Sequence, residues 1–213
     1  LHYYATHPQT FCCDGRVSGD FVSAAREEVE RAEGLFQIYF TGCAGDVTVG
    51  KYNDGSLRAR QALAGRLRNA IEAAIASSRL APISALRWRT AELRLPPRSR
   101  PAPAAPQSPE AAYRAAIAEA FAARRIPLEA SALELGEVHI LHLPGEPMLE
   151  FHRYAQGLRR DRFVAVAGYG DMSPGYLCTD RTFEEGGYEP TAANAGPATE
   201  AQVKRAIERL LGR

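Results

Sequence analysis

The spacing of apolar residues along the chain predicts an alternation of strands and helices. Apolar runs typical of strands lie at residues 2–7, 36–40, 83–95 and 163–167, and residues 133–143 read as a hairpin. Residues at helical spacing follow Asp20, form the longest helix between Leu63 and Ile75, and recur after Ser108 and after Thr199. Alternating strands and helices predict a layered α/β fold in which helices flank the sheet, and the hairpin makes that sheet mixed.

Local signals set the ends of several elements. Gly34 is placed to end the first helix, and Thr199 with Gln202 has the pattern of a capping box for the last helix. The alternation of the 83–95 run slips at residues 90–92, which predicts a β-bulge. Residues 96–106 are rich in proline and alanine, so we expect a surface excursion there and no domain boundary.

Several polar residues come directly after predicted strands. They are His7, the loop at residues 42–48, Glu146 and the loop at residues 168–176. Because ligands of open α/β sheets bind at the carboxyl ends of strands, we expect one sheet edge to gather these residues. Pro147 is expected at the first position of a helix, so Glu146 would lie where exposed backbone N–H groups favour a carboxylate. That position suits a metal ligand.

Length and charge restrict the classes of protein that need to be considered. The 213 residues with 46% hydrophobic content fit one domain or a large piece of one. A net charge of +1 gives no electrostatic reason to expect nucleic acid as a partner, and no apolar run approaches the roughly 20 residues that span a bilayer. Leu1 is not an initiator methionine and residues 2–4 read as mid-strand, so we expect residues 1–213 to be the carboxyl-terminal part of a longer domain. Compartment and oligomeric state stay open.

The four cysteines contain no Cys-x-x-Cys pair. We expect buried free thiols in preference to disulfides or metal ligands. Cys43 and Cys178 lie in glycine-containing loops beside the expected site, which makes them candidates for oxidation.

Four segments occur in an order that resembles one enzyme family. They are Ala5-Thr6-His7 with Ser18-Gly19-Asp20, then Pro144-Gly145-Glu146, then Tyr176, and finally Tyr188-Glu189 twelve positions after Tyr176. Thr182-Phe183-Glu184-Glu185 stands where this family has Thr-Tyr-Glu-Glu. The segments resemble the catalytic amino-terminal domain of the neutral ceramidases, which are zinc amidases that cleave N-acyl sphingoid bases.

The resemblance implies a Zn²⁺ ion held by His7, Glu146 and Tyr176, with Tyr188 as a second active-site tyrosine. Without it, a lone histidine at a strand end reads as a structural hydrogen-bonding residue. Tyr176 alone reads as a loop anchor, since phenolate is an uncommon zinc ligand. The family's first zinc histidine lies upstream of the segment matched here, so either a longer polypeptide supplies it or the site is incomplete.

The sequence departs from the family at Gly45-Asp46-Val47-Thr48, where neutral ceramidases have Gly-Asp-Val-Ser-Pro-Asn with a serine important for activity. Thr48 keeps the hydroxyl, adds a methyl group and stiffens χ1. We expect Asp46 to fix this loop in preference to acting as a base. Thr48 is expected to hydrogen-bond the substrate or the leaving amine in preference to acting as a covalent nucleophile, because no histidine is tied to it in sequence.

The reaction implied by the resemblance is hydrolysis of an N-acyl, ceramide-like amide by metal-activated water, with Tyr188 hydrogen-bonded to the developing oxyanion. The expected partners are therefore a small-molecule amide or lipid substrate and the upstream part of the same polypeptide. Two alternatives stay open at this point. The chain could be a ceramidase-fold binding domain without catalysis, or a hydrolase of small non-lipid amides or esters, since charged and small residues flank the expected site.

Overall fold

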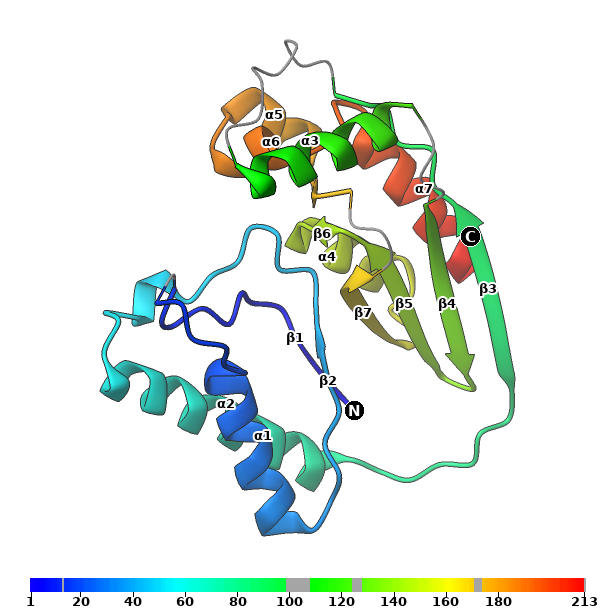
Figure 1. Cartoon of the computed structure of the whole chain (residues 1–213). Helices are drawn as coiled ribbons and strands as arrows, with labels where there is room; N and C mark the ends of the chain where they lie inside the picture. The colour runs from blue at the N-terminus through cyan, green and yellow to red at the C-terminus, as the bar shows by residue number, and fades with distance from the viewer. Residues whose placement is uncertain (13, 99–107, 124–127, 171–173, 213) are drawn as a thin grey trace. The chain divides into compact units, whose positions relative to one another are not determined.

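A computed structural model describes residues 1–12, 14–98, 108–123, 128–170 and 174–212 (Figure 1). The chain forms two compact units. The first unit consists of Leu1–Thr41 and Val47–Pro82, and the second unit of Gly42–Asp46 and Ile83–Arg213. Each unit has its own hydrophobic core and is described by itself.

The first unit contains two helices and one pair of short strands. Strand β1 (His2–Tyr4) lies parallel to β2 (Tyr39–Thr41), and a 3₁₀ turn, η1 (Gly50–Tyr52), precedes the long helix. Helix α1 (Asp20–Glu33) packs on α2 (Leu57–Ser77) through the residues whose spacing predicted the two helices. Their shared core is formed by Phe21, Val22, Ala25, Val29, Leu63, Ala64, Leu67 and Ile71.

The ends of α1 and α2 follow the chemistry of helix capping. Gly34 ends α1 in the left-handed conformation, with φ +64°, and its N–H donates to the Glu30 carbonyl as predicted. At the start of α2 the Ser56 hydroxyl accepts a hydrogen bond from the Ala59 N–H.

The predicted buried strand at residues 36–40 is wrong in position and in burial. The strand is β2, and Phe36 is 82% exposed. β2 pairs only with the three residues of β1, and this pairing begins at Tyr39. A run of apolar residues indicates that a strand can form, but the partner strand decides which residues pair and which are covered.

The second unit is built on a mixed four-stranded sheet with the order β3-β4-β5-β7. Its strands are β3 (Leu86–Glu92), β4 (Glu129–Leu135), β5 (Val138–Pro144) and β7 (Phe163–Gly170). The hairpin of β4 and β5 turns at Gly136, which has φ +58°. β5 and β7 are parallel, so the predicted layered α/β fold with a mixed sheet is confirmed.

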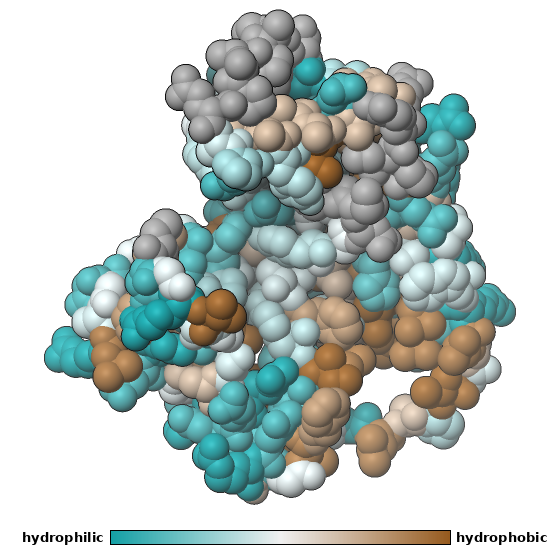
Figure 2. All heavy atoms as spheres, viewed as in Figure 1, coloured by the Kyte–Doolittle hydropathy of each residue, from teal (hydrophilic) through white to brown (hydrophobic). Residues whose placement is uncertain are grey.

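Two helices, α4 (Leu149–Leu158) and α7 (Thr199–Leu211), cover one face of this sheet. The core beneath them contains Ala132, Leu141 and Val166, which are cross-strand neighbours. The other face carries exposed hydrophobic side chains at Leu86, Trp88 and Phe163. Figure 2 shows hydrophobic and hydrophilic residues on one side of the molecule.

The remaining elements of the second unit are short or lightly packed. They are α3 (Pro109–Ala122), β6 (Glu146–Pro147), β8 (Tyr176–Leu177), α5 (Asp180–Glu185) and α6 (Tyr188–Ala192). Most of the proline-rich stretch 96–106 lies outside the described residues. Within the part of the chain that the structure describes, none of the helices has the length and apolar content needed to cross a bilayer.

The predicted bulge at residues 90–92 is wrong, because β3 pairs with β4 in continuous register from Leu86 to Glu92. The slip in alternation has an electrostatic cause. Arg87 and Arg89 point to the same face as the buried Ala91, where they lie 3.7 and 3.5 Å from the Glu134 carboxylate. Ion pairing at the end of the covered face therefore replaces apolar side chains there.

The predicted capping box at the start of α7 is also wrong. The residue before the helix is Ala198, in the left-handed conformation with φ +70°, and no side chain caps the helix. The Thr199 hydroxyl instead donates to the Gly196 carbonyl at 2.6 Å, and the Ala198 N–H donates to the Asp180 carboxylate. The Thr199 hydroxyl is thus used by a carbonyl three residues earlier, and the N–H before the helix is used by a tertiary contact with Asp180.

Candidate active site

Glu146 lies where the central strand of the second unit leaves the sheet. β5 ends at Pro144, which pairs with Gly170 at the end of the parallel strand β7. Glu146 then begins β6, which pairs in parallel with β8, so that Glu146 lies opposite Tyr176. The carboxyl ends of two parallel strands therefore bring Glu146 to the predicted edge of the sheet.

Pro147 does not start a helix as predicted. It is the second residue of β6, and α4 begins at Leu149 after Met148. The Pro147 carbonyl accepts a hydrogen bond from the Gly45 N–H at 2.9 Å, so this residue is held in an extended segment between two neighbouring chains. A proline is compatible with this position because the hydrogen bonds to the β8 segment are donated by the Glu146 and Met148 N–H groups.

Glycines allow the backbone around Glu146 to pack closely. Gly145 has φ +67°, and a Cβ atom there would lie 2.5 Å from the Gly175 carbonyl oxygen. Gly175 has φ +76° and a Cβ atom there would lie 2.9 Å from the Ala192 oxygen, while a Cβ atom on Gly45 would lie 2.6 Å from the Glu146 oxygen. The segments of Gly45 and Gly175 thus approach residues 145–146, and Ala192 approaches Gly175, at distances that only glycine permits.

The side chains of Glu146, Tyr176 and Tyr188 come together at this point. The Tyr176 hydroxyl donates a hydrogen bond to the Glu146 carboxylate. The rings of Tyr176 and Tyr188 lie edge to face with centroids 6.0 Å apart. Tyr188 is the first residue of α6 and is 65% exposed, whereas Tyr176 packs against the core.

Electrostatics favour the neutral form of the Tyr176 phenol. Burial raises the pKa of Tyr176 well above its ordinary value, and the Glu146 charge and hydrogen bond raise it further. Tyr188 and Glu189 add smaller contributions in the same direction. The Tyr176 phenol therefore keeps its proton near neutral pH. A cation bound to the Tyr176 and Glu146 oxygens would have to displace that proton.

Asp46 fixes the start of helix α4. Its carboxylate accepts a hydrogen bond from the Leu149 N–H at 2.7 Å, although the two residues are 103 positions apart. This contact joins the 42–46 loop to the segment that follows Glu146. Asp46 thus has a structural role in the second unit, of the kind expected for it.

His7 and Thr48 come together in the first unit. They form an isolated parallel bridge, and the His7 N–H donates to the Val47 carbonyl at 2.9 Å. The same carbonyl lies 3.0 Å from His7 Nδ1. Because a carbonyl oxygen only accepts, Nδ1 carries the proton in this contact and Nε2 carries the lone pair that a metal ligand needs.

The Asp20 carboxylate holds the segment that follows His7. It accepts hydrogen bonds from the Thr10 N–H at 2.8 Å and from the Thr10 hydroxyl at 2.5 Å. It also accepts from the Phe21 N–H, and the Ser18 hydroxyl accepts from the Asp20 N–H. The Ser-Gly-Asp segment therefore ties the His7 segment to the start of α1.

Gln9 is a site residue that the sequence analysis missed. Its side-chain amide donates to the Thr48 hydroxyl at 2.8 Å, which orients the group that replaces the family's serine. Gln9 is two positions after His7, and the Gln9 N–H donates to the His7 carbonyl at 3.0 Å, so a tight turn at Pro8 brings the two residues together. No periodicity in the sequence marks this residue, because its partner Thr48 lies 39 positions away.

The structure thus gathers the candidate residues into two groups. Glu146, Tyr176 and Tyr188 form one group in the second unit, and His7 with Thr48 forms the other in the first unit. The convergence of His7 with Glu146 stays a prediction. Among the described residues no three His, Cys, Asp or Glu side chains gather where one metal ion could bind. The Glu146–Tyr176 pair is not such a group, because one of its two donors is a phenol.

The cysteines near these groups are buried as predicted, except that Cys12 is exposed, and Cys13 lies outside the described residues. Burial raises the pKa of both Cys43 and Cys178 to about 12. Both thiols therefore stay protonated at neutral pH, and thiolate is the form that reacts with oxidants.

Comparisons with known proteins match this chain through its fold. No family model and no curated protein matches the sequence. The neutral ceramidase from Pseudomonas aeruginosa matches 99% of this chain with a TM-score of 0.69 at 17% identity. A ceramidase complexed with C2 matches 96% of it with a TM-score of 0.72 at 14% identity.

The fold is similar to that of the neutral ceramidases. The chain spans 44% of the length of each of these two solved proteins. Identities this low relate the folds alone, so the chemistry has to be argued from the residues of this chain.

The close packing at Gly145 leads to a stability prediction. Gly145→Ala should lower the free energy of unfolding of the second unit by at least about 2 kcal/mol, because Ala is strained at positive φ and its methyl group meets the Gly175 oxygen. Gly157→Ala is the matched control, since its Cβ meets nothing within 4 Å, and helical Ala should add up to about 1 kcal/mol. Urea unfolding followed by the fluorescence of Trp88 measures both; equal stabilities would contradict the packing argument.

A second prediction concerns the proton on Tyr176. Glu146→Gln should lower the pKa of Tyr176, because a neutral amide no longer opposes the phenolate, while burial should keep it above its ordinary value. NMR titration of protein labelled at the tyrosine ring carbons measures this shift. Glu150→Gln, on the exposed side of α4, should leave the Tyr176 titration unchanged. An unaltered titration in Glu146→Gln would show that the two side chains do not interact.

Proposed function

We propose that the chain is part of a ceramidase-like zinc amidohydrolase that cleaves an N-acyl amide. The observation that carries this proposal is the Glu146–Tyr176–Tyr188 group, which stands at the carboxyl ends of parallel strands in a ceramidase-like fold. These are the residue types and the chain order that the family resemblance requires. The ceramide-like nature of the substrate rests on the resemblance and on the solved neighbours.

The chemistry of the donor groups fits zinc. Glu146 and Tyr176 offer oxygen atoms that are joined by a hydrogen bond from the phenol to the carboxylate. His7 offers Nε2, because its Nδ1 faces the Val47 carbonyl. Carboxylate oxygen and imidazole nitrogen are ordinary zinc ligands, and phenolate is a less common one. Since Tyr176 would have to lose its proton to bind, zinc affinity should rise with pH. We expect a further histidine ligand from outside residues 1–213.

In the proposed reaction, water adds to the amide carbonyl carbon, the carbon–nitrogen bond breaks, and the leaving amine takes a proton. Zinc, when bound, would lower the pKa of water to about 7 and polarise the carbonyl. Tyr188 would donate its hydroxyl proton in a hydrogen bond to the carbonyl oxygen as negative charge develops there. Its exposure and its edge-to-face contact with Tyr176 suit a residue that meets substrate while held beside the ligands.

Thr48 and Asp46 take supporting roles in this proposal. The Thr48 hydroxyl accepts from Gln9, so its own proton is available for the substrate carbonyl or the leaving amine. Asp46 acts through Leu149 by fixing the start of α4 immediately after β6. Neither role requires Thr48 to form a covalent intermediate.

The zinc role of Glu146 leads to a third prediction. In the full-length protein, Glu146→Ala should lower bound zinc from one equivalent to a small fraction and abolish amide hydrolysis, with little change in the thermal midpoint. Metal content by mass spectrometry, measured beside activity and melting, tests this. Glu150→Ala is the control, because this exposed carboxylate on α4 should leave all three quantities unchanged. Retention of zinc and activity in Glu146→Ala would refute the proposal.

A fourth prediction separates catalysis from loop anchoring at Tyr188. Tyr188→Phe should lower kcat by roughly 10²–10³ and leave KM nearly unchanged, because the lost hydrogen bond is strongest in the transition state. If Tyr188 only anchors the segment after Gly187, KM should rise by at least the factor by which kcat falls. Tyr113→Phe, at an exposed tyrosine of α3, is the matched control and should behave as the parent protein.

A further inference from the structure

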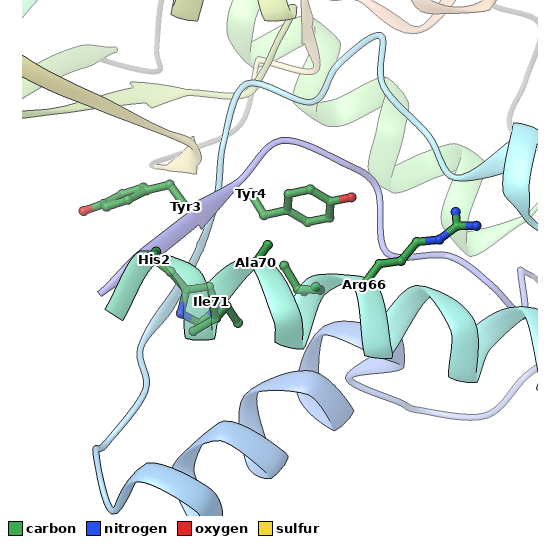
Figure 3. Close-up of a pocket in the computed structure, with 8 residues that line it drawn as sticks. His2, Tyr3, Tyr4, Arg66, Ala70 and Ile71 are labelled. Carbon is green, nitrogen blue, oxygen red and sulfur yellow. The ribbon is translucent and has the colours of Figure 1, made fainter. Parts of the chain in front are cut away.

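The first unit contains a groove that the proposed reaction does not use. It lies between β1 and α2 and has a volume of about 230 Å³. Its wall includes the three residues of β1 and one side of α2 (Figure 3). From α2 the groove is lined by Arg66, Leu67, Ala70, Ile71 and Ala74.

The floor of the groove is apolar because of the residues that α2 places there. Leu67 and Ile71 are fixed by the core that α2 shares with α1, so the floor is rigid. Ala70 and Ala74 have only methyl side chains, which leaves the groove open. On the other side, Tyr4 lies edge to face with the core residue Phe21, with ring centroids 6.3 Å apart.

One end of the groove is cationic. Arg66 lies at this end, and the Tyr4 ring points along α2 towards it (Figure 3). The Arg66 guanidinium stacks on the Tyr52 ring at 4.9 Å, and Lys51 Nζ lies 5.3 Å from the same ring. Within the described part of the chain Arg66 forms no ion pair, whereas Arg68 on the same helix lies 3.2 Å from Glu28.

The other end of the groove is lined by an imidazole in place of a guanidinium. His2 lies there beside Ile71, and burial lowers the pKa of its imidazole, with the Arg26 charge acting in the same direction. The groove therefore has a largely apolar floor and a guanidinium at one end. Such an arrangement is complementary to an amphiphile with a single anionic head.

We propose that this groove binds a small monocarboxylic acid, with its carboxylate on Arg66 and its apolar tail on Leu67, Ala70 and Ile71. A guanidinium recognises a carboxylate through paired hydrogen bonds, and the Tyr4 hydroxyl is placed to add one more. The volume limits the ligand to about ten non-hydrogen atoms, since sites for larger ligands occupy roughly 300–1,000 Å³. The proposal depends neither on zinc nor on amide hydrolysis.

Octanoate and octanamide form a matched pair of probes, since they differ in charge and share the same tail. Titration of the full chain by NMR should show octanoate binding with a Kd of the order of millimolar, as a ligand of this size allows, and octanamide binding about tenfold more weakly. Shifted resonances should map to β1 and α2. Absence of octanoate binding at about 20 mM, or equal affinity for the two probes, would overturn the proposal.

Three variants assign the contacts. Arg66→Gln should weaken octanoate about tenfold and leave octanamide unchanged, because only the charged head uses the guanidinium. Ala70→Phe, at an exposed position of α2, should fill the groove and abolish binding of both probes. Arg58→Gln removes an equally exposed charge from the same helix and should change neither affinity. An effect of Arg58→Gln as large as that of Arg66→Gln would reduce the result to general charge attraction and contradict the site.

Discussion

The close approach of two glycine-containing segments determines the geometry of the second unit's functional edge. The Glu146 N–H donates to the Gly175 carbonyl at 3.0 Å, and the positive φ angles of Gly145 and Gly175 allow the two chains to meet. This contact sets the register in which Glu146 lies opposite Tyr176. A side chain on either glycine would separate the strands. The Tyr176 phenol would then no longer donate its hydrogen bond to the Glu146 carboxylate.

The hydrogen bond from Tyr176 to Glu146 has an energetic consequence. A carboxylate next to a buried phenol is stable as long as the phenol stays neutral and donates, because a second negative charge in the same place would be poorly solvated. The pair is therefore a stable hydrogen bond in the absence of a cation and a strong oxygen donor set in its presence. Metal binding by this pair would therefore be coupled to proton release.

The first unit presents its candidate residues by a different means. Its core is a pair of helices, while His7 and Thr48 form a bridge outside that core and Gln9 contacts Thr48. Asp20 connects the two, because its carboxylate holds Thr10 while its backbone begins α1. The positive φ of Asp20, +55°, shows that the chain accepts a strained conformation to make these hydrogen bonds.

The sequence by itself determined the elements whose signals are local. Helical spacing identified α1, α2 and α7, Gly34 marked the end of α1, and the β4–β5 hairpin followed from alternation around Gly136. The strand pattern that ends at residue 143 placed Glu146 directly after a strand. These features depend on residues a few positions apart, so the periodicity of one segment is enough to specify them.

Only the tertiary structure decided which segments became partners. It placed β2 opposite β1 and left Phe36 exposed, paired the Ala198 N–H with Asp180, and assigned Pro147 to a strand beside Gly45. It also gave Asp46 a partner 103 residues away. Burial and hydrogen bonding at these positions depend on contacts between segments distant in sequence, and no local pattern records which distant backbone will supply the missing donor or acceptor.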